Sequence, residues 1–468
     1  MKKDKKRIVL ENILVTDYAA EGKALAKYDG KVIFISGAVP GDTVDVFLTK
    51  NKKDWAEARV IAIKTPAVDR QTPFCKHFGV CGGCKWQMLP YAKQLQYKQQ
   101  EVEQNLKRIG KVELPALMPI VGADDDKHYR NKLEFTFSNK RYLLPEEMSV
   151  EETTTQSNAL GFHVPRLFDK IIDIQECYLM DDVNNAIRNS VRDFALQHNF
   201  SFYDVRQHTG WLRNIVIRNC TTGELMVNII FNNEDEANRK LLLDDLLQKV
   251  PAITTLLYTI NPKFNDTIYD LTPITYFGKG YAIEKLENFS YKISPKSFFQ
   301  TNTKQAEKLY QITRDFAGLT GNEVVYDLYC GTGSIGIFVS QLAKKIIGVE
   351  AIDDAIIDAK ENAAINNITH AHFFAGDVIK ICNDEFFATH GKPDVVITDP
   401  PRAGMHEKLV NKLLEIEAPK IVYVSCNTAT QARDIALLDE KYKVEKIQPV
   451  DMFPHTHHIE CVVLLVLK

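Results

Sequence analysis

The sequence predicts an α/β protein in which a Rossmann-like domain of parallel strands follows an N-terminal OB-like β-barrel and a central α+β domain. Three observations support this prediction. The chain has 468 residues, too many for one hydrophobic core, and this length suggests about three domains. Residues 323–336 read as a buried strand, a glycine-rich turn and the start of a helix. Residues 6–65 contain short alternating apolar runs separated by turn residues.

Composition and charge restrict the classes of function. The chain has 58 Lys and Arg against 61 Asp and Glu, a formal net charge of −3, so a nucleic-acid partner would have to bind at local patches. No apolar run approaches about 18 residues and the start has no long apolar core, so we expect neither a membrane span nor a signal peptide. We expect a cytoplasmic monomer whose nine cysteines act as ligands or in catalysis rather than in disulfides.

The first domain, residues 1–65, is predicted to be the β-barrel. Alternating runs at 8–15, 31–35, 43–48 and 55–63 predict its strands. OB-like barrels of this size frequently bind RNA. Lys50, Lys52 and Lys53 form a basic tip, which is either an RNA contact or a solvated turn.

Residues 66–125 contain a cysteine motif and a helix. The motif is Cys75-x5-Cys81-x2-Cys84, and thiolates at this spacing bind zinc or an iron–sulfur cluster. Either centre requires a fourth ligand, for which Cys177 is the candidate; plain structural thiols are the third interpretation. The helix is predicted over 91–109 from the apolar spacing, and its lysines, Lys98 among them, are expected on a solvated face.

The central domain, residues 126–285, is predicted to combine an antiparallel sheet with a helix over 180–198. Arg130 and Lys132 are candidate phosphate contacts, with an internal ion pair as the alternative for Arg130. A strand over 211–218 carries Arg213 and Arg218, which indicate either RNA contact or protection of a sheet edge. The acidic and polar stretch 145–158 is expected to be an exposed loop.

The C-terminal domain, residues 286–468, repeats a pattern of apolar runs that end in polar residues. The runs at 324–326, 346–349, 371–375, 394–398 and 420–424 predict parallel strands, whose carboxyl ends form the reactive edge of an open α/β sheet. The residues at these ends are Asp327, Glu350, Asp377, Asp399 and Cys426. The turn fits G-x-G-x-x-G, which also occurs in dinucleotide dehydrogenases and in purely structural turns. Several carboxylates beside a glycine turn suit S-adenosylmethionine, and a dehydrogenase has no need of Asp399-Pro-Pro-Arg402 and a cysteine.

Five motifs occur here in one order: D-x-Y-C-G-x-G, G-V-E, D-P-P-R-A-G, V-S-C-N and H-x-E-C. Together they resemble the RNA 5-methyluridine methyltransferases of the TrmA/RumA type, which methylate uracil C5 in ribosomal or transfer RNA. Residues 21–35 and 38–44 resemble the TRAM domain of this family. The cysteine spacing resembles the [4Fe–4S] site of the branch that acts on 23S ribosomal RNA, so the resemblance favours a cluster over zinc and ribosomal RNA over transfer RNA.

The resemblance also implies roles for individual residues. Cys426 is the expected nucleophile, Glu460 the base, and Asp399 orients the uracil or the donor. Phe298 is expected beside the target base, whereas Phe299 is expected to pack in the core. The residues expected to bind S-adenosylmethionine are Gln300, Tyr329, Ser334, Glu350, Asp377 and Asp399. The histidines at 455, 457 and 458 suggest a metal site as an alternative, but the family uses this phrase for the base.

Uracil C5 is a poor nucleophile, which explains the residues that the reaction needs. A thiolate that adds at C6 makes C5 nucleophilic toward the sulfonium methyl, and a base must then remove the C5 proton so that the thiol can leave. Two other classes of function remain at this stage. One is an amino-directed nucleic-acid methyltransferase that uses the Asp-Pro-Pro-Arg loop. The other is a non-catalytic, metal-containing RNA-binding protein.

Overall fold

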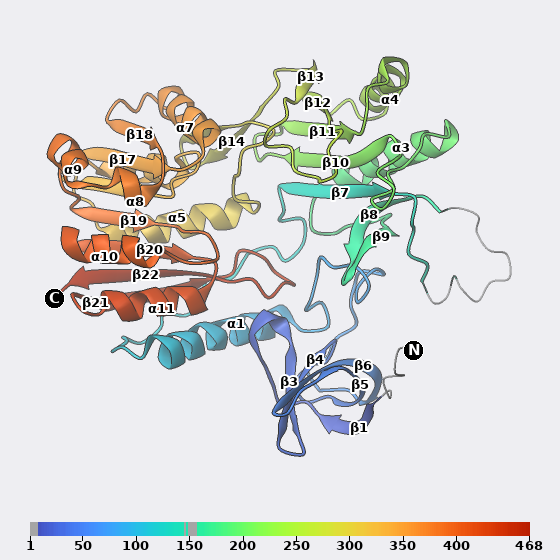
Figure 1. Ribbon diagram of the computed structural model, residues 1–468, viewed down its shortest axis with the longest axis horizontal. Helices are drawn as coiled ribbons and strands as arrows, with labels where there is room; N and C mark the ends of the chain where they lie inside the picture. Colours follow the sequence, from blue (N-terminus) through green and yellow to red (C-terminus); the bar gives the residue numbers. More distant parts are fainter. Residues whose placement is uncertain (1–7, 145–146, 148–156) are drawn as a thin grey trace.

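The computed structural model describes residues 8–144, 147 and 157–468 (Figure 1). The stretch 145–158, expected as an exposed loop, falls almost entirely outside the described residues. Within them the chain forms an N-terminal barrel sheet, a central sheet covered by helices and a C-terminal α/β sheet, together with a small hairpin. No helix in the described ranges is both long and apolar enough to cross a membrane.

The N-terminal barrel has the predicted all-β structure. Its strands, in sheet order, are β1 (Val9–Leu14), β5 (Thr43–Asn51), β6 (Trp55–Thr65), β4 (Lys31–Ser36), β3 (Ala24–Tyr28) and β2 (Asp17–Tyr18). Its core combines small side chains such as Ala24 and Ala56 with β-branched ones such as Ile33 and Val44. Alanines allow the curved strands to approach closely, and β-branched side chains favour the extended backbone.

Helix α1 (Tyr91–Asn105), which ends in one π-helical turn (Leu106–Gly110), runs beneath the C-terminal domain in Figure 1. Val102 and Leu106 are buried in a core shared with that domain, as their spacing predicts, but Ile109 is exposed. The expectation of a solvated Lys98 is wrong: this side chain is fully buried, because an aspartate of the C-terminal domain pairs with it.

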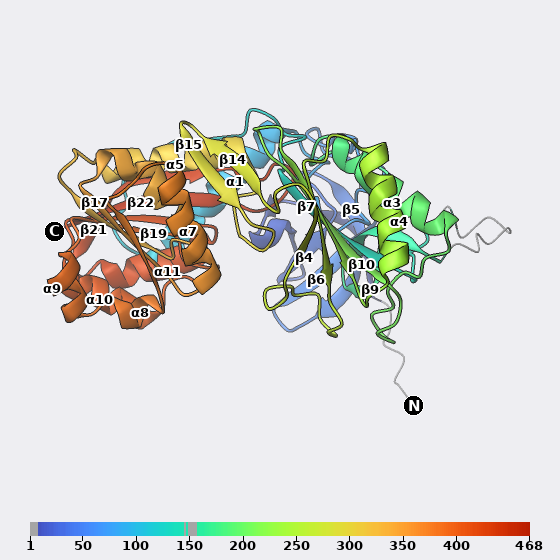
Figure 2. The ribbon, with the colours of Figure 1, turned by 90° about the horizontal axis from the view of Figure 1, so that it is seen from above.

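Among the described residues, the helices that pack on the central sheet lie on one of its faces. Its strand order is β13 (Ile274–Phe277), β12 (Thr255–Ile260), β11 (Leu225–Phe231), β10 (Leu212–Asn219), β7 (Lys132–Ser138), β8 (Ala159–Val164) and β9 (Leu167–Asp173). Helices α3 (Val183–Gln197) and α4 (Glu236–Lys249) pack on one side, and Figure 2 shows the other side turned toward the C-terminal domain. Protection of a sheet edge by Arg213 and Arg218 is ruled out, because β10 lies between β11 and β7.

A hairpin of β14 (Ala282–Leu286) and β15 (Phe289–Ile293) follows the central sheet. Leu286, Phe289 and Tyr291 are buried in the core of the C-terminal domain, because this hairpin packs beside its first helices. The domain boundary expected at 285/286 therefore lies within this hairpin.

The C-terminal domain is a seven-stranded sheet between two layers of helices. The strand order is β18 (Ala371–Ala375), β17 (Lys345–Glu350), β16 (Val324–Leu328), β19 (Val395–Thr398), β20 (Lys420–Ser425), β22 (Glu460–Leu467) and β21 (Tyr442–Val450). Six of these strands run in one direction and only β22 runs in the opposite one. The helices are α5 (Thr303–Ala317), α6 (Ser334–Val339), α7 (Asp353–Ile365), α8 (Val378–Ile381), α9 (Asp384–His390), α10 (Glu407–Ile416) and α11 (Thr428–Leu438). The five strands predicted from apolar runs are confirmed, whereas β21 was not predicted because charged residues interrupt its pattern.

Candidate active site

The register of two strands brings Cys426 and Glu460 together. β20 and β22 are antiparallel, and Ser425 pairs with Cys461. Because Cys426 follows Ser425 and Glu460 precedes Cys461, the two residues occupy neighbouring positions at the carboxyl end of β20. Asp399 follows β19, the strand paired with β20, and so lies at the same edge.

Burial and mutual repulsion set the protonation of these groups. Burial, together with the nearby Asp399 carboxylate, raises the pKa of Glu460 well above its usual range, and burial also raises the pKa of Asp399. Burial and the same two carboxylates raise the pKa of the Cys426 thiol to about 11, against the opposing effect of Arg402. The resting site therefore holds a neutral thiol beside one cation that favours the thiolate.

Arg402 is held beside the thiol by contacts on both its side chain and its backbone. Its Nη2 lies 3.1 Å from Nδ1 of His458, whose pKa burial lowers to about 3, so the neutral imidazole accepts this hydrogen bond. The Arg402 carbonyl accepts from Asn427 Nδ2 at 2.9 Å. Asn427 also caps α11 by accepting the N–H of Ala429. The Asp-Pro-Pro-Arg loop is thus tied to the residue that follows Cys426.

The glycine turn after β16 brings the backbone close to the same edge. Tyr329, Gly331 and Gly333 have φ angles of 61°, 52° and 75°, in the left-handed region that favours glycine. Gly333 immediately precedes α6. A Cβ on Gly336 would lie 2.9 Å from Asp327 Oδ2, so a side chain at this position would displace the carboxylate.

Two buried polar atoms at this edge have no partner among the described residues. Asp327 is 1% exposed; its Oδ2 accepts the N–H of Gly336 at 2.8 Å, but its Oδ1 is unpaired. Thr398 Oγ1, at the end of the adjacent β19, is also unpaired. Since buried polar groups are nearly always paired, these atoms indicate a polar ligand. Asp327 is not among the predicted donor residues, although the D-x-Y-C-G-x-G motif begins with it.

Glu350 and Asp377 lie at the ends of the next two strands. Glu350 accepts the N–H of Gly331 on Oε2 at 3.2 Å and the N–H of Ile352 on Oε1 at 3.0 Å. Each oxygen keeps a lone pair, so the carboxylate is a fixed acceptor for ligand hydroxyl groups. Asp377 is exposed and accepts the N–H of Ile379 at 3.0 Å at the start of α8.

The remaining predicted residues lie near the first helices of the domain. Ser334 Oγ is 3.0 Å from the Tyr310 hydroxyl, and the pKa of Tyr310 is raised mainly by burial, with further contributions from Asp399, Asp327 and Glu460. Gln300 is 8% exposed, whereas Phe298 is 72% exposed and available to a base. Phe299 is 3% exposed, which confirms its expected place in the core.

Comparisons with known proteins show the family of this chain. Residues 275–468 match the family model described as tRNA (Uracil-5-)-methyltransferase, and residues 11–61 match the TRAM domain. An uncharacterized RNA methyltransferase of Bacteroides thetaiotaomicron is 53% identical over 453 residues, which cover 96% of this chain and 100% of that protein. A second one, of Porphyromonas gingivalis, is 50% identical over 97% of this chain and 99% of its own length.

This chain belongs to the RNA uracil-5 methyltransferase family. A crystal structure of the Pyrococcus abyssi tRNA (uracil-54, C5)-methyltransferase in complex with S-adenosyl-L-homocysteine has a TM-score of 0.74 and 26% identity, over 98% of this chain and 100% of that one. The fold is therefore that of an S-adenosylmethionine-dependent methyltransferase with an N-terminal TRAM domain, as the sequence predicts.

Several segments of the methyltransferase hold the loop that precedes Glu460. The His455 carbonyl accepts the backbone N–H groups of Lys85, at 2.7 Å, and Trp86, at 3.1 Å, directly after Cys84. His455 itself is buried and has a φ of 62°. Further hydrogen bonds to this loop come from Tyr129, Asn302 and Gln305. The position of Glu460 therefore depends on the cysteine segment.

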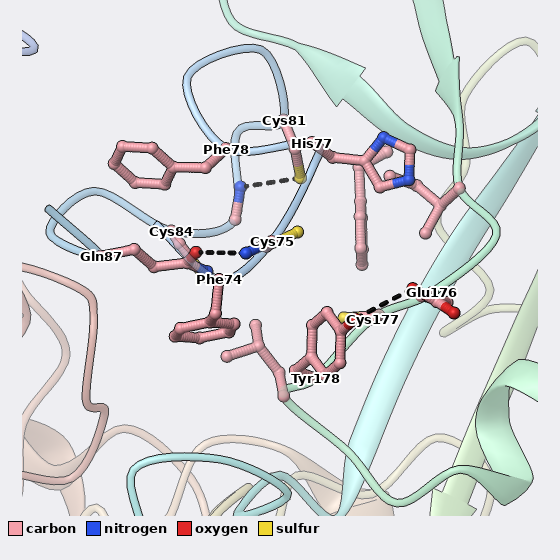
Figure 3. A pocket seen from close by; sticks show the side chains of 14 residues that line it. Phe74, Cys75, His77, Phe78, Cys81, Cys84, Gln87, Glu176, Cys177 and Tyr178 are labelled. Atoms are coloured by element: carbon pink, nitrogen blue, oxygen red, sulfur yellow. Dashed lines mark hydrogen bonds between the residues drawn. The ribbon is translucent and has the colours of Figure 1, made fainter. Parts of the chain in front are cut away.

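The four predicted cysteine ligands line one pocket (Figure 3). Cys75, Cys81 and Cys84 come from one loop, and Cys177 comes from the segment after β9. All four thiols are free, and burial raises the pKa of Cys81 and Cys84 to about 12. His77, also in the pocket, is buried, and neither of its ring nitrogens has a partner in the described part of the chain. Among the described residues, no three His, Cys, Asp or Glu side chains are grouped closely enough to bind a single metal ion.

Arg130 and Lys132 lie on either side of Asn131, where the central domain contacts the C-terminal domain. The Arg130 guanidinium lies 4.9 Å from the ring of Phe453, and its Nε is buried without a partner in the described chain. No ion pair of Arg130 is found among the described residues, so the internal-pair alternative has no support there. Lys132 begins β7 on the helix-free face of the central sheet.

Proposed function

We propose that this methyltransferase transfers a methyl group from S-adenosylmethionine to uracil C5 in 23S ribosomal RNA through a covalent Cys426 adduct. The adjacency of Cys426 and Glu460 carries the proposal, because the strand register sets a nucleophile beside a buried carboxyl group. An amino-directed methyltransferase would need the Asp-Pro-Pro-Arg loop but not this pair.

The residues perform the reaction in a defined order. The Cys426 thiol gives its proton to solvent water while the Arg402 cation stabilises the thiolate. The sulfur then bonds to uracil C6, and the electron pair of the C5–C6 double bond moves onto C5. The donor supplies the methyl group, which C5 takes as the sulfonium carbon–sulfur bond breaks. Glu460 in its ionised form then removes the C5 proton, the double bond re-forms, and the Cys426 sulfur leaves C6. The RNA base must leave its stack to reach Cys426.

The donor fits the polar groups at the ends of β16 to β18. The unpaired Asp327 Oδ1 suits the cationic amine of the methionine part, and the fixed Glu350 carboxylate suits the ribose hydroxyls. The exposed Asp377 would accept from the adenine, as the sequence suggests. Gln300, Tyr329, Ser334 and Asp399 would complete this site, with Phe298 beside the uracil.

The four-cysteine pocket suits a [4Fe–4S] cluster. A single tetrahedral zinc ion, with Zn–S bonds of about 2.3 Å, would require its sulfurs within about 4 Å of one another. In a cluster each cysteine binds a separate iron atom, so the cysteines can lie farther apart. The presence of four free thiols around one pocket supports this proposal. The cluster would hold the loop of Cys84, and through His455 the loop of Glu460.

The cysteine pocket is also the observation that favours ribosomal RNA, because the resemblance links this cysteine set to the ribosomal branch. Transfer RNA is the second candidate. Its support is the structural similarity to the archaeal tRNA (uracil-54, C5)-methyltransferase. Mass mapping of 5-methyluridine in ribosomal and transfer RNA, from cells with and without this protein, separates the two substrates.

One pair of variants tests the chemistry. Cys426→Ala should abolish methylation and form no adduct, because attack at C6 cannot begin. Glu460→Gln should still add to C6 and accept the methyl group, but the C5 proton would remain and the RNA would stay bonded to Cys426. A denaturing gel should show a slow protein–RNA band for Glu460→Gln and none for the double variant.

Cys382→Ala is the matched control, since this cysteine is buried in the hydrophobic core of the C-terminal domain and has no part in the proposed chemistry, so its replacement should leave turnover unchanged. Turnover by Cys426→Ala would refute the C5 mechanism. Normal turnover by Glu460→Gln would remove Glu460 from it.

A further inference from the structure

Two cations face each other on the helix-free side of the central sheet. Arg218 on β10 and Lys132 on β7 are direct partners in the antiparallel register. Side chains at such positions have Cβ atoms about 4.5–5.5 Å apart, and like charges directly opposite each other destabilise a sheet. Arg218 is 3% exposed and Lys132 is half-buried, so water screens this repulsion poorly.

The described residues offer little compensation for these charges. Arg218 Nη1 has one long hydrogen bond, 3.4 Å to Asn131 Oδ1, and neither cation forms an ion pair within the described chain. The nearby buried Glu284 is occupied by neutral donors, namely Thr221, Lys285 N–H and Thr303. Glu134, at the next position of β7 on the same face, is exposed and acts on Lys132. A buried arginine without a carboxylate in hydrogen-bonding contact is rare, because its desolvation is costly.

The same face carries further polar groups without partners. Asn214 and Asn228, each 3% exposed, leave Oδ1 and Nδ2 respectively unpaired among the described residues. Residues at alternate positions of β7, β10 and β11 share this face, whereas the intervening ones pack under α3 and α4. The polar row is therefore a property of the face that α3 and α4 leave uncovered, which lies toward the C-terminal domain in Figure 2.

The pair also adjoins the proposed base site. Asn131, which accepts from Arg218, donates its Nδ2 to the Gln300 carbonyl at 2.9 Å. Gln300 is two residues from the exposed Phe298. An anion held between Arg218 and Lys132 would thus be linked through Asn131 to the segment that carries Phe298.

We propose that Arg218 and Lys132 together bind a backbone phosphate of the RNA, next to the nucleotide that contacts Phe298. This assignment rests on the proposed function for the identity of the anion. One phosphodiester offers oxygens to both cations, and its negative charge replaces their repulsion by two charge-assisted contacts. Phosphate contacts position RNA without reading its sequence, so the pair would fix the register of the strand in the site.

The test measures how salt weakens RNA binding. A fluorescein-labelled oligouridylate is titrated with the full-length protein at several KCl concentrations. Lys132→Met and Arg218→Met should each bind several-fold more weakly, and the slope of log K against log[salt] should become shallower by up to about 0.7, the value for one single-strand phosphate contact. Lys240→Met, on the helix-covered side, is the control and should keep the wild-type slope.

A second readout separates RNA binding from a structural role. Because it removes one of two facing cations, Lys132→Met should raise the thermal midpoint of the RNA-free protein while it weakens RNA binding. Arg218→Lys, which keeps the charge, should keep most of the salt slope. A Lys132→Met protein with a lowered midpoint and an unchanged slope would overturn the proposal, as would binding of inorganic phosphate alone with no change in the RNA slope.

The two proposals can fail separately. If the pair binds RNA but the chemistry is different, the slopes change while Cys426→Ala keeps its activity. If the chemistry is right but the pair has no RNA role, Cys426→Ala is inactive while both methionine variants show the wild-type slope. Binding of S-adenosyl-L-homocysteine should be normal in every variant of the pair.

Discussion

Lys98 Nζ lies 2.6 Å from Asp451 Oδ1, and both side chains are fully buried. Lys98 lies on α1, and Asp451 follows β21 at the start of the loop that leads to Glu460. Lys98 also donates to the Phe453 carbonyl at 3.1 Å, and Tyr91 donates to the other oxygen of Asp451 at 2.8 Å. This ion pair joins the cysteine-bearing segment to the catalytic domain.

Loss of either partner should destabilise the protein strongly. Lys98→Met leaves the Asp451 carboxylate buried without its cation, which costs about 3–5 kcal/mol. The double variant Lys98→Met/Asp451→Leu should recover much of that loss, because no isolated charge remains. Urea unfolding of the full chain measures both effects. An unchanged midpoint for the single variant would mean that the pair contributes nothing to stability.

The cysteine pocket should yield a brown protein when it is prepared without oxygen. We expect this protein to contain iron and sulfide and to show a broad absorbance shoulder in the visible range. Both would come from a [4Fe–4S] cluster bound by Cys75, Cys81, Cys84 and Cys177. Cys177→Ser should lose most of the iron, whereas Cys220→Ser, a buried cysteine outside the pocket, should keep it. Stoichiometric zinc without iron in anaerobic preparations would contradict the cluster.

Donor binding should depend on the strand-end carboxylates. Glu350→Ala should weaken S-adenosyl-L-homocysteine binding by about 1–3 kcal/mol, because buried ligand hydroxyls lose their acceptor. Asp377→Ala should fall at the lower end of that range, since this side chain is exposed. Calorimetric titration measures both, with the exposed Glu385→Ala as control. RNA affinity should be nearly unchanged, and normal donor binding by both variants would overturn the assignment.

Arg402 should control the ionisation of Cys426. Burial and two carboxylates raise the pKa of this thiol to about 11, and Arg402 lowers it. Arg402→Met should therefore raise the pKa further and slow alkylation by iodoacetamide several-fold below pH 9, with recovery at higher pH. The rate is taken as the difference between each protein and its Cys426→Ala counterpart. Arg314→Met, whose ion pair with Glu287 lies elsewhere, should show the wild-type profile.

Much of the C-terminal fold could be predicted because its signals are local. The strand 371–375 has the predicted bounds, and the runs that become β16, β17, β19 and β20 are right to within two residues. Buried parallel strands read as continuous apolar runs, and glycine turns are visible as sequence. The strand β21 was missed because lysine and glutamate alternate with its buried residues, in a pattern that also fits a surface loop.

The sequence by itself determined the family, the parallel sheet, the glycine turn and the residue types that the chemistry needs. The tertiary structure decided which residues lie in contact with one another. Lys98 looks like a solvated helix lysine until Asp451, more than three hundred residues away in the chain, pairs with it. Arg218 looks like edge protection until β10 is placed inside its sheet, directly opposite Lys132. In both cases burial and the opposing charge come from distant segments, and local spacing carries no information about such partners.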